Sequence, residues 1–173
     1  GKIIYQDACS IEEYDDAGSL HDKLMKMGSA LVLKTVDAIE NRSVKLQEQV
    51  MPFNRAPRVA PKLTKETGRI DWSAGARVVN LLIRGLSPYP VAYSTLVAGE
   101  KVLNVKIFEA YAVNSNDYSL PEGTIRTDGK SFLEVRCGSG ALRILSLQIA
   151  GKKRMDVAAF LAGFRDIENY RFV

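Results

Sequence analysis

Residues 123–150 read GTIRTDGKSFLEVRCGSGALRILSLQIA and contain the signals that decide the fold. The Asp-Gly dipeptide at 128–129 is typical of a β-hairpin turn. After this turn Leu133 and Val135 alternate with polar residues, as expected of a strand with one buried face. The Gly-Ser-Gly sequence at 138–140 predicts a second turn, so this stretch is a run of short antiparallel strands.

The strand that follows, at residues 141–150, changes its apolar face partway along. Leu142 and Ile144 follow one alternation, whereas Leu145 and Leu147 follow the other. A switch of face within one strand indicates a β-bulge or the kind of bend found in barrels.

Two more strands and a helix are predicted upstream. Residues 91–98 and 102–113 are apolar in alternation and are separated by a turn. A helix is expected from its cap at Ser73 to Leu86, because the sequence Ser-Pro-Tyr-Pro at 87–90 cannot continue it. The apolar side of this helix is predicted to be Val78, Val79, Leu82, Ile83 and Leu86.

A short final helix completes the predicted domain. It is expected at residues 157–161, with its start at Asp156 or a neighbouring residue and Gly163 after its end. About five antiparallel strands with flanking helices predict an α+β chain. Residues 73–173 are therefore expected to form a small, partly open β-barrel of the OB type.

Residues 1–50 have a different pattern. A short strand is predicted at residues 2–8, and an apolar stripe from Leu20 to Ile39 predicts one long helix. A lone strand has no ladder partner, and a helix laid on it leaves apolar surface in water. We therefore expect a strand–helix remnant of an α/β domain whose other strands lie upstream of Gly1. Its open edge and apolar surface are expected to recruit a partner chain, for example in a dimer.

The charges of the chain are distributed unequally. Residues 1–50 carry six basic and nine acidic side chains, whereas residues 51–173 carry eighteen basic and eleven acidic ones. Residues 51–72 are rich in proline and basic residues, which predicts an extended linker. A basic C-terminal part favours a polyanion as partner, although solvated surface charge is the open alternative. The candidate polyanion-binding residues are Arg55, Arg58, Lys62, Lys65, Lys152, Lys153 and Arg154.

Composition and motifs exclude several classes of protein. The chain is 46% apolar and 25% charged, which is ordinary for a globular protein, and no apolar run is long enough for a transmembrane helix. Cys9 and Cys137 are far apart, which favours a reducing compartment such as the cytoplasm. The single histidine, His21, lies beside the apolar stripe of a predicted helix. Neither a metal site nor an autonomous catalytic motif is visible in the sequence.

Several motifs, in chain order, resemble the methionyl-tRNA formyltransferase family over nearly the whole chain. They read APKLTKE at 60–66, RIDWS at 69–73, IRGLSPYPVA at 83–92, GSGAL at 138–142, GKKRM at 151–155 and FLAG at 160–163. The departures are modest: Lys2 replaces a usual acid, Tyr89 a usual Trp and Val91 a usual Gly.

The resemblance implies a cytoplasmic enzyme that transfers a formyl group from 10-formyltetrahydrofolate to methionyl initiator tRNA in translation initiation. The family has a Rossmann-like catalytic domain and an OB-like C-terminal domain that helps to hold the tRNA. By this resemblance, residues 1–50 are the end of the catalytic domain, residues 51–72 the linker and residues 73–173 the tRNA-binding domain.

The resemblance also implies that the catalytic Asn, His and Asp all precede Gly1. This chain alone is then expected to be catalytically incompetent and to bind neither the formyl donor nor a metal. Two alternatives stay open. One is the C-terminal part of another 10-formyltetrahydrofolate-dependent enzyme, such as an amino-sugar formyltransferase, and the other is a freestanding OB-type RNA-binding module.

Overall fold

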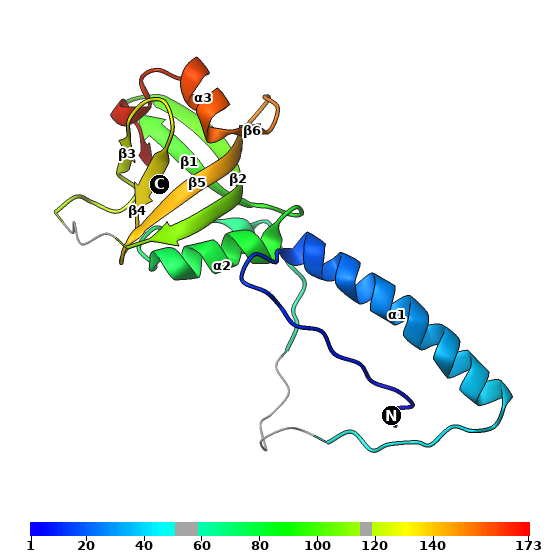
Figure 1. The fold of residues 1–173 in the computed structure, drawn as a ribbon. Coiled ribbons are helices and arrows are strands. Elements are labelled where there is room, and N and C mark those ends of the chain that lie inside the picture. The colour runs from blue at the N-terminus through cyan, green and yellow to red at the C-terminus, as the bar shows by residue number, and fades with distance from the viewer. Residues whose placement is uncertain (51–58, 115–118) are drawn as a thin grey trace. The chain divides into compact units, whose positions relative to one another are not determined.

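The computed structural model describes residues 1–50, 59–114 and 119–173, and the chain forms two compact units (Figure 1). The first unit is residues 1–63 and the second is residues 64–173. The second unit includes the last part of the predicted linker, because Ile70 and Trp72 lie in its hydrophobic core.

The first unit is built around α1, the helix Ala17–Glu40. The carboxylate of Asp16 accepts a hydrogen bond from the Ser19 amide at 2.8 Å, and the Ser19 hydroxyl accepts one from the Asp16 amide at 3.1 Å. This reciprocal capping box satisfies amides that have no partner within the helix. The predicted helix is confirmed, and the capping box explains where it begins.

The apolar stripe of α1 is exposed, as expected from the sequence. Leu24 is 51% exposed, Val32 is 61% exposed and Ile39 is 55% exposed. Ala38 is the one buried residue of this helix, all of which is described. Because burial of apolar surface is the main stabilising term in folding, α1 gains little from the described part of this chain.

The strand predicted at residues 2–8 is wrong. The structure has only a bridge between Ile3 and Gln47, in which each amide donates to the other residue's carbonyl at 2.8 Å. Among the described residues of this unit no regular strand lies beside the segment, so the pairing ends after one pair of residues.

The second unit contains an antiparallel sheet to which its described residues contribute seven strands (Figure 1). They are β1 (Ala92–Ala98), β2 (Lys101–Val113), β3 (Ile125–Thr127), β4 (Leu133–Arg136), β5 (Ala141–Ile149), β6 (Met155–Asp156) and β7 (Arg171–Phe172). The strand order is β3-β4-β5-β2-β1-β7, and β6 pairs with β5. The five predicted strands are confirmed. β6 and β7 were not predicted, because strands of two residues are too short to show alternation.

The sheet closes nearly into a barrel where β7 meets the residues before β3. Thr124 forms an antiparallel bridge with Arg171, and the Phe172 amide donates to the Gly123 carbonyl at 2.9 Å. Gly123 has a φ of +80°, and a Cβ atom there would lie 2.0 Å from the Phe172 carbonyl oxygen. This closure therefore requires glycine at position 123.

The face switch predicted in the fifth strand is confirmed as an irregularity between β2 and β5. The register shifts on both sides of Glu109, which pairs with Ser146, so Phe108 and Leu145 have no partner in the ladder. As a result Leu145 is 43% exposed, whereas Leu147 is 1% exposed. Such bulges bend a strand and increase its twist, which helps a sheet to curve.

Helix α2 (Ala76–Leu86) packs against β2 and β5, but it begins later than predicted. Its cap is Gly75, not Ser73, because the amide and hydroxyl of Ser73 both donate to Asp71, at 2.9 and 2.6 Å. The placement of Val78 on the buried side is also wrong, since it is 61% exposed. The buried side consists of Ala76, Val79, Ile83 and Leu86.

The last helix, α3 (Val157–Gly163), confirms its predicted cap. Asp156 accepts a hydrogen bond from the Ala159 amide at 2.7 Å. Two 3-10 helices complete the unit, η2 (Glu66–Gly68) and η3 (Ile167–Asn169).

Val91 adopts a backbone conformation that favours glycine. Its φ is +78°, and its side chain is 5% exposed. The Val91 amide donates to the Leu86 carbonyl at 2.9 Å, so this conformation ends the turn between α2 and β1. The geometry explains why the related motif usually has glycine at this position.

Candidate nucleic-acid interface

The predicted polyanion-binding residues fall into three groups in the structure. Arg55 and Arg58 lie outside the described residues. Lys62 belongs to the first unit, where it is exposed and has no regular secondary structure. The other four belong to the second unit and are all exposed; they are Lys65, Lys152, Lys153 and Arg154.

Lys152 and Lys153 lie in the turn between β5 and β6, and hydrogen bonds hold the backbone of this turn. The Lys152 amide donates to the Ile149 carbonyl at 3.0 Å, and the Gln148 side-chain amide donates to the Lys152 carbonyl at 2.8 Å. Gly151 has a φ of +78°. The two ammonium groups are thus carried on an ordered turn, which lowers the entropy lost when a polyanion is bound.

Arg154 differs from the two lysines because its guanidinium is already engaged. Its Nε donates to the Ser146 hydroxyl at 2.8 Å, and its Nη2 donates to the Glu109 carboxylate. The guanidinium also lies 4.4 Å from the centre of the Phe108 ring. Arg154 therefore ties the turn to the bulge of β2 and β5.

Lys65 occupies the position before η2, and the Gly68 amide donates to its carbonyl at 3.0 Å. The adjacent carboxyl of Glu66 has a pKa below its ordinary value. Its own backbone amide contributes most, followed by the Thr64 side chain, and the charge of Lys65 adds a smaller effect. This end of the unit consequently carries both charge signs.

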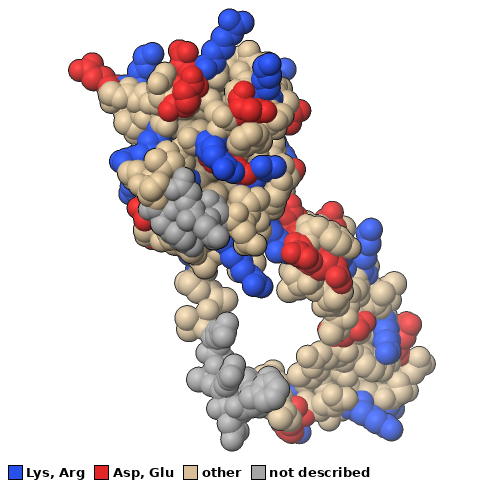
Figure 2. Space-filling model, turned by 60° about the vertical axis from the view of Figure 1, so that its left-hand side comes forward, with Lys and Arg blue, Asp and Glu red and all other residues tan. Residues whose placement is uncertain are grey.

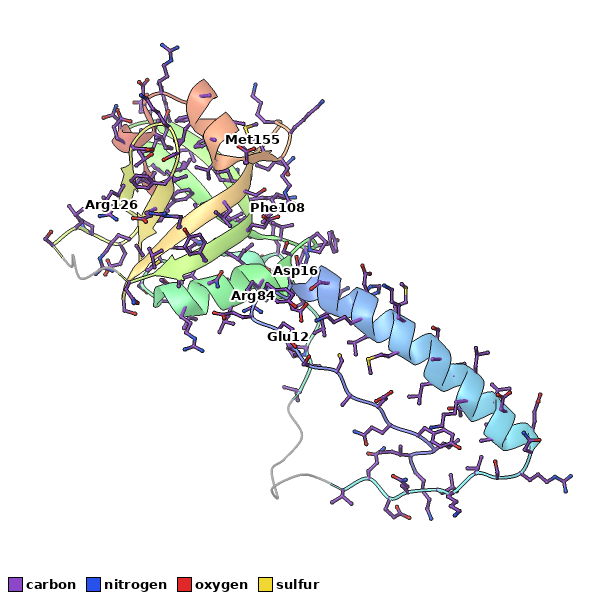
Figure 3. All side chains as sticks on the ribbon, viewed as in Figure 1. Glu12, Asp16, Arg84, Phe108, Arg126 and Met155 are labelled. Atoms are coloured by element: carbon purple, nitrogen blue, oxygen red, sulfur yellow. The ribbon has the colours of Figure 1, made fainter. Side chains whose placement is uncertain are left out.

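A second arginine-containing group was missed by the sequence analysis. The Glu134 carboxylate accepts bonds from Nε and Nη2 of Arg126, at 2.9 and 2.5 Å, and from the same atoms of Arg143, at 2.9 and 2.5 Å. Its side chain is 3% exposed, although alternation predicted an outward polar residue. The bond to Glu134 raises the pKa of Arg143 above its ordinary value. In Figure 3, Arg126 lies on another side of the barrel from Phe108.

The Arg126–Glu134–Arg143 group has mainly a structural role, because its one buried carboxylate neutralises part of the charge of the two arginines. The signal that could have found it is the hairpin register. The turn at 128–129 places Arg126 opposite Glu134, and the next turn places Arg143 opposite Glu134 on its other side. On the face that Figure 2 shows, Lys and Arg are interspersed with Asp and Glu.

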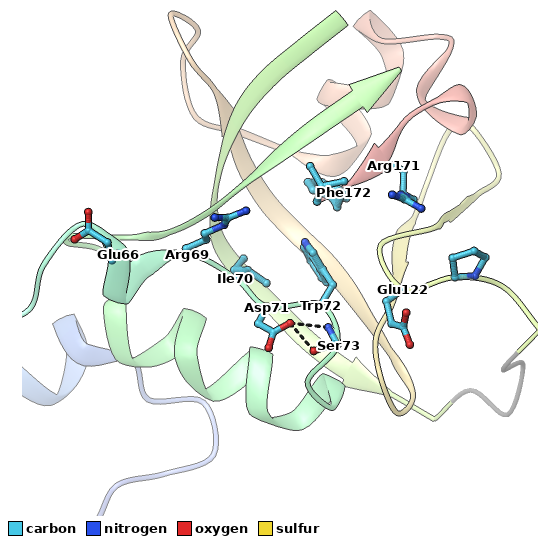
Figure 4. Close-up of a pocket in the computed structure, with 11 residues that line it drawn as sticks. Glu66, Arg69, Ile70, Asp71, Trp72, Ser73, Glu122, Arg171 and Phe172 are labelled. Carbon is cyan, nitrogen blue, oxygen red and sulfur yellow. Dashed lines mark hydrogen bonds between the residues drawn. The ribbon is translucent and has the colours of Figure 1, made fainter. Parts of the chain in front are cut away.

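A groove of about 620 Å³ opens beside the end of β7 (Figure 4). It is lined by Glu66, Arg69, Ile70, Asp71, Trp72, Ser73, Pro121, Glu122, Arg171, Phe172 and Val173. The Trp72 indole donates to the Ser94 hydroxyl at 2.8 Å, and its ring lies 5.1 Å from that of Phe172. The Asp71 carboxyl has a pKa below its ordinary value because the hydroxyl and amide of Ser73 donate to it. The Asp71 carboxylate thus orders the residues just before α2, and the described residues that line the groove include no histidine, lysine or cysteine.

The remaining candidates for chemistry have structural roles. The His21 side chain is 73% exposed, and its Nδ1 lies 3.3 Å from the Asp22 carboxylate. Cys137 is buried, and burial raises the pKa of its thiol to about 11, which makes it an unreactive core residue. Within residues 1–50, 59–114 and 119–173, no three His, Cys, Asp or Glu side chains gather into a group that could bind a metal. Among these residues no helix has the length and apolarity to cross a membrane.

Curated proteins with similar sequences match nearly the whole chain. A methionyl-tRNA formyltransferase of Bacteroides thetaiotaomicron is 45% identical over 99% of this chain and 53% of its own length. A protein of the same name from Azobacteroides pseudotrichonymphae is 43% identical over 94% of this chain and 51% of its own length. Another, from Staphylococcus aureus, is 37% identical over 96% of this chain and 51% of its own length. The chain thus spans about half the length of the curated relatives that it matches.

A solved structure also has a similar fold. The crystal structure of a HypX variant from Aquifex aeolicus matches 77% of this chain and 22% of its own, with a TM-score of 0.52 and 20% sequence identity. This likeness concerns the fold alone. Residues 62–165, more than half of the chain, match the family described as "Formyl transferase, C-terminal domain". Together with the related sequences, this match shows that the chain belongs to the formyl transferase C-terminal domain family.

Proposed function

We propose that this chain is the C-terminal part of a methionyl-tRNA formyltransferase and that it contributes binding of the tRNA. The whole enzyme would transfer a formyl group from 10-formyltetrahydrofolate to methionyl initiator tRNA, in the cytoplasm. The observation that carries the proposal is the similarity, at 37–45% identity over at least 94% of this chain, to proteins of that name. The exposed lysines of the second unit are consistent with a polyanionic substrate.

The proposal assigns a role to each part of the chain. Residues 73–173 would be an OB-like tRNA-binding domain, which the nearly closed antiparallel sheet supports. The linker would lie within residues 51–72, the last part of which packs into the second unit. Residues 1–50 would be the end of a Rossmann-like catalytic domain, and the exposed apolar stripe of α1 supports a partner surface supplied by the rest of that domain.

Among residues 1–50, 59–114 and 119–173, we find no group placed as the chemistry of the formyl donor requires. The donor's chemistry needs a base and hydrogen-bond donors placed around the reacting carbonyl. His21 is an exposed side chain on α1, and the acids of the groove beside Trp72 are bonded to neighbouring groups or open to water. We therefore assign the reaction itself to the part of the proposed enzyme outside this chain.

The test is tRNA binding by the full-length protein, measured as a function of salt concentration together with formylation activity. Replacing Lys62 and Lys65 with Ala, or Lys152 and Lys153 with Ala, should each flatten the plot of log affinity against log salt by about one to two units, because each phosphate contact releases counterions. Arg154 is left unchanged because its removal would also break contacts within the barrel. Lys26→Ala/Lys130→Ala removes the same charge from exposed positions elsewhere and serves as the control.

The results separate the proposals. Formylation of methionyl initiator tRNA with 10-formyltetrahydrofolate supports the family assignment, and its absence together with absent tRNA binding would favour an amino-sugar formyltransferase. If tRNA binds but both lysine variants retain the slope of the unmodified protein, these lysines are solvated surface groups and the proposed interface is wrong.

A further inference from the structure

A row of outward-facing side chains crosses the three strands β1, β2 and β5. Lys106 of β2 lies opposite Tyr93 of β1 on one side and opposite Gln148 of β5 on the other. The neighbours of Lys106 along β2, Val105 and Ile107, are 1% and 0% exposed, whereas Lys106 itself is exposed. Because side chains alternate between the faces of a strand, the row lies on the outer face of the barrel.

The Tyr93 end of the row lies against η2, and Lys65 directly precedes η2. A Cβ atom on Gly68 would lie 3.4 Å from the Tyr93 ring, so η2 rests against this side chain. The Ile70 amide donates to the Tyr93 carbonyl at 2.9 Å, and Lys65 is joined to Gly68 by the hydrogen bond described above. Lys65 is therefore held beside the row by the chain that packs on β1.

The other end of the row lies beside the turn between β5 and β6 that carries Lys152 and Lys153, which we call the lysine turn. The side-chain amide of Gln148 donates to the Lys152 carbonyl at 2.8 Å. Lys65 and Lys152 are far apart in the sequence, and Lys106 is the cation that lies between them. Adjacent strands are about 4.8 Å apart, so the three strands of the row span roughly 10 Å.

The charge of Lys106 and its lack of an ion pair among the described residues favour binding of a polyanion over a structural role. Lys106 makes no ion pair with any residue that the structure describes, in contrast to Lys23, which binds Asp15, and Arg154, which binds Glu109. The neighbours of Lys106 across the strands are an aromatic residue and an amide, not acids. Aromatic and basic groups arranged side by side are typical of surfaces that bind nucleic acids.

We infer that Lys106 contacts the tRNA phosphate backbone and that the backbone crosses β1, β2 and β5 along the row from Lys65 to Lys152. The inference rests on the proposed function, because it names the path of the same substrate. It assigns Lys106 a binding role that its position in the middle of a strand did not suggest from sequence.

The test compares Lys106→Ala with Lys101→Ala in the full-length protein. Both lysines are exposed and both lie on β2, but Lys101 lies at the hairpin end, opposite Ala98, and outside the row. Lys106→Ala should flatten the salt dependence of tRNA binding by about 0.7–0.9 and weaken binding roughly five- to tenfold near 0.1 M salt. Lys106→Arg should restore most of the slope because it keeps the charge, and Lys101→Ala should leave the slope unchanged.

Circular dichroism spectra and melting temperatures identical to those of the unmodified protein would show that Lys106→Ala acts on binding and not on folding. If Lys152→Ala/Lys153→Ala flattens the slope but Lys106→Ala does not, the path across the row is wrong while the proposed function stands. If the unmodified protein does not bind tRNA at all, the proposed function fails, and the inference fails with it.

Discussion

Helices α1 and α2 both carry apolar residues at helical spacing, but these residues are exposed in the first unit and buried in the second. In α2, Val79 and Ile83 are 2% and 0% exposed, whereas in α1 Leu24 and Val32 are 51% and 61% exposed. The difference lies in what each unit offers as a partner. The second unit provides a nearly closed sheet, whereas the described residues of the first provide one isolated bridge. An amphipathic pattern therefore shows that a helix has an apolar side, but it does not show what covers that side.

The comparison also applies to charged groups. In the second unit, Glu134 is buried and bonded to two arginines. In the first unit, Lys2 pairs with Glu48 at 2.8 Å, and their side chains are 54% and 74% exposed. Buried charged networks contribute substantially when every member is bonded, whereas exposed ion pairs contribute little. The two units should thus respond very differently to equivalent substitutions.

The largest expected contrast is between Leu133→Ala and Leu24→Ala in this chain. Leu133 is 0% exposed in β4, so its truncation should lower the free energy of unfolding by about 2–5 kcal/mol. Leu24→Ala should change it by less than about 0.5 kcal/mol, because the side chain is half exposed. Urea unfolding measures both, with the fluorescence of Trp72, the single tryptophan, for the second unit and far-UV circular dichroism for α1.

If Leu24→Ala lowered the free energy of unfolding as much as Leu133→Ala, the contrast between the two units would be wrong, because the apolar stripe of α1 would then be covered. If that loss then depended on protein concentration, the cover would be a second copy of the chain, as the open apolar surface led us to expect. In the full-length protein, a large effect of Leu24→Ala is the expected result if residues 1–50 complete a catalytic domain, as we propose.

A smaller contrast is expected between Glu134→Gln and Glu48→Gln. Glu134→Gln keeps the shape of the side chain but removes the charge that Arg126 and Arg143 share, so the loss should be about 1–3 kcal/mol. The exposure of Arg126, 68%, keeps this value below that of a fully buried pair. Glu48→Gln should cost less than about 1 kcal/mol. Equal losses in urea unfolding would contradict the view that the buried Glu134 contributes more to stability than the exposed Lys2–Glu48 pair.

Local signals in the sequence predicted much of the second unit. The turn at 128–129, the cap at Asp156 and the face switch near residue 144 each depend on neighbouring residues, and the structure confirms them. The prediction of Ser73 as the helix cap was wrong. The Ser73 hydroxyl donates a hydrogen bond to the Asp71 carboxylate and does not cap the amides at the start of α2. The helix begins instead after Gly75, with no side-chain cap, and sequence alone does not show which partner the Ser73 hydroxyl binds.

Long-range pairing was the main part that the sequence did not reveal. β7 pairs with β1 through two residues, and the row from Lys65 to Lys152 depends on which strands are neighbours. The lysine turn was identified because its cations are consecutive, whereas Lys106 is isolated among apolar residues. A cation of this kind becomes a candidate only once the strand order is known.

The smallest expected effect concerns acid stability, and it again differs between the units. The pKa of Asp15 is lowered from 3.8 to about 2, mainly because its carboxylate binds the Lys23 ammonium at 2.5 Å, with further bonds from the Glu12 amide and the Ser19 hydroxyl. A lowered folded-state pKa means that the ionised group stabilises the fold above about pH 4. This stabilisation is lost as the pH falls from about 4 to 2.

Asp15→Asn should therefore reduce the pH dependence of the α1 circular dichroism signal between pH 4 and 2. It should leave the Trp72 fluorescence of the second unit unchanged. In that unit Asp128 also has a pKa well below its ordinary value, because the Ser131 hydroxyl and several backbone amides donate to it. Asp22→Asn removes a carboxylate that is 68% exposed on the same helix and is the matched control. If Asp15→Asn and Asp22→Asn have the same effect on the acid transition of α1, then Asp15 and its bond to Lys23 do not stabilise the start of this helix.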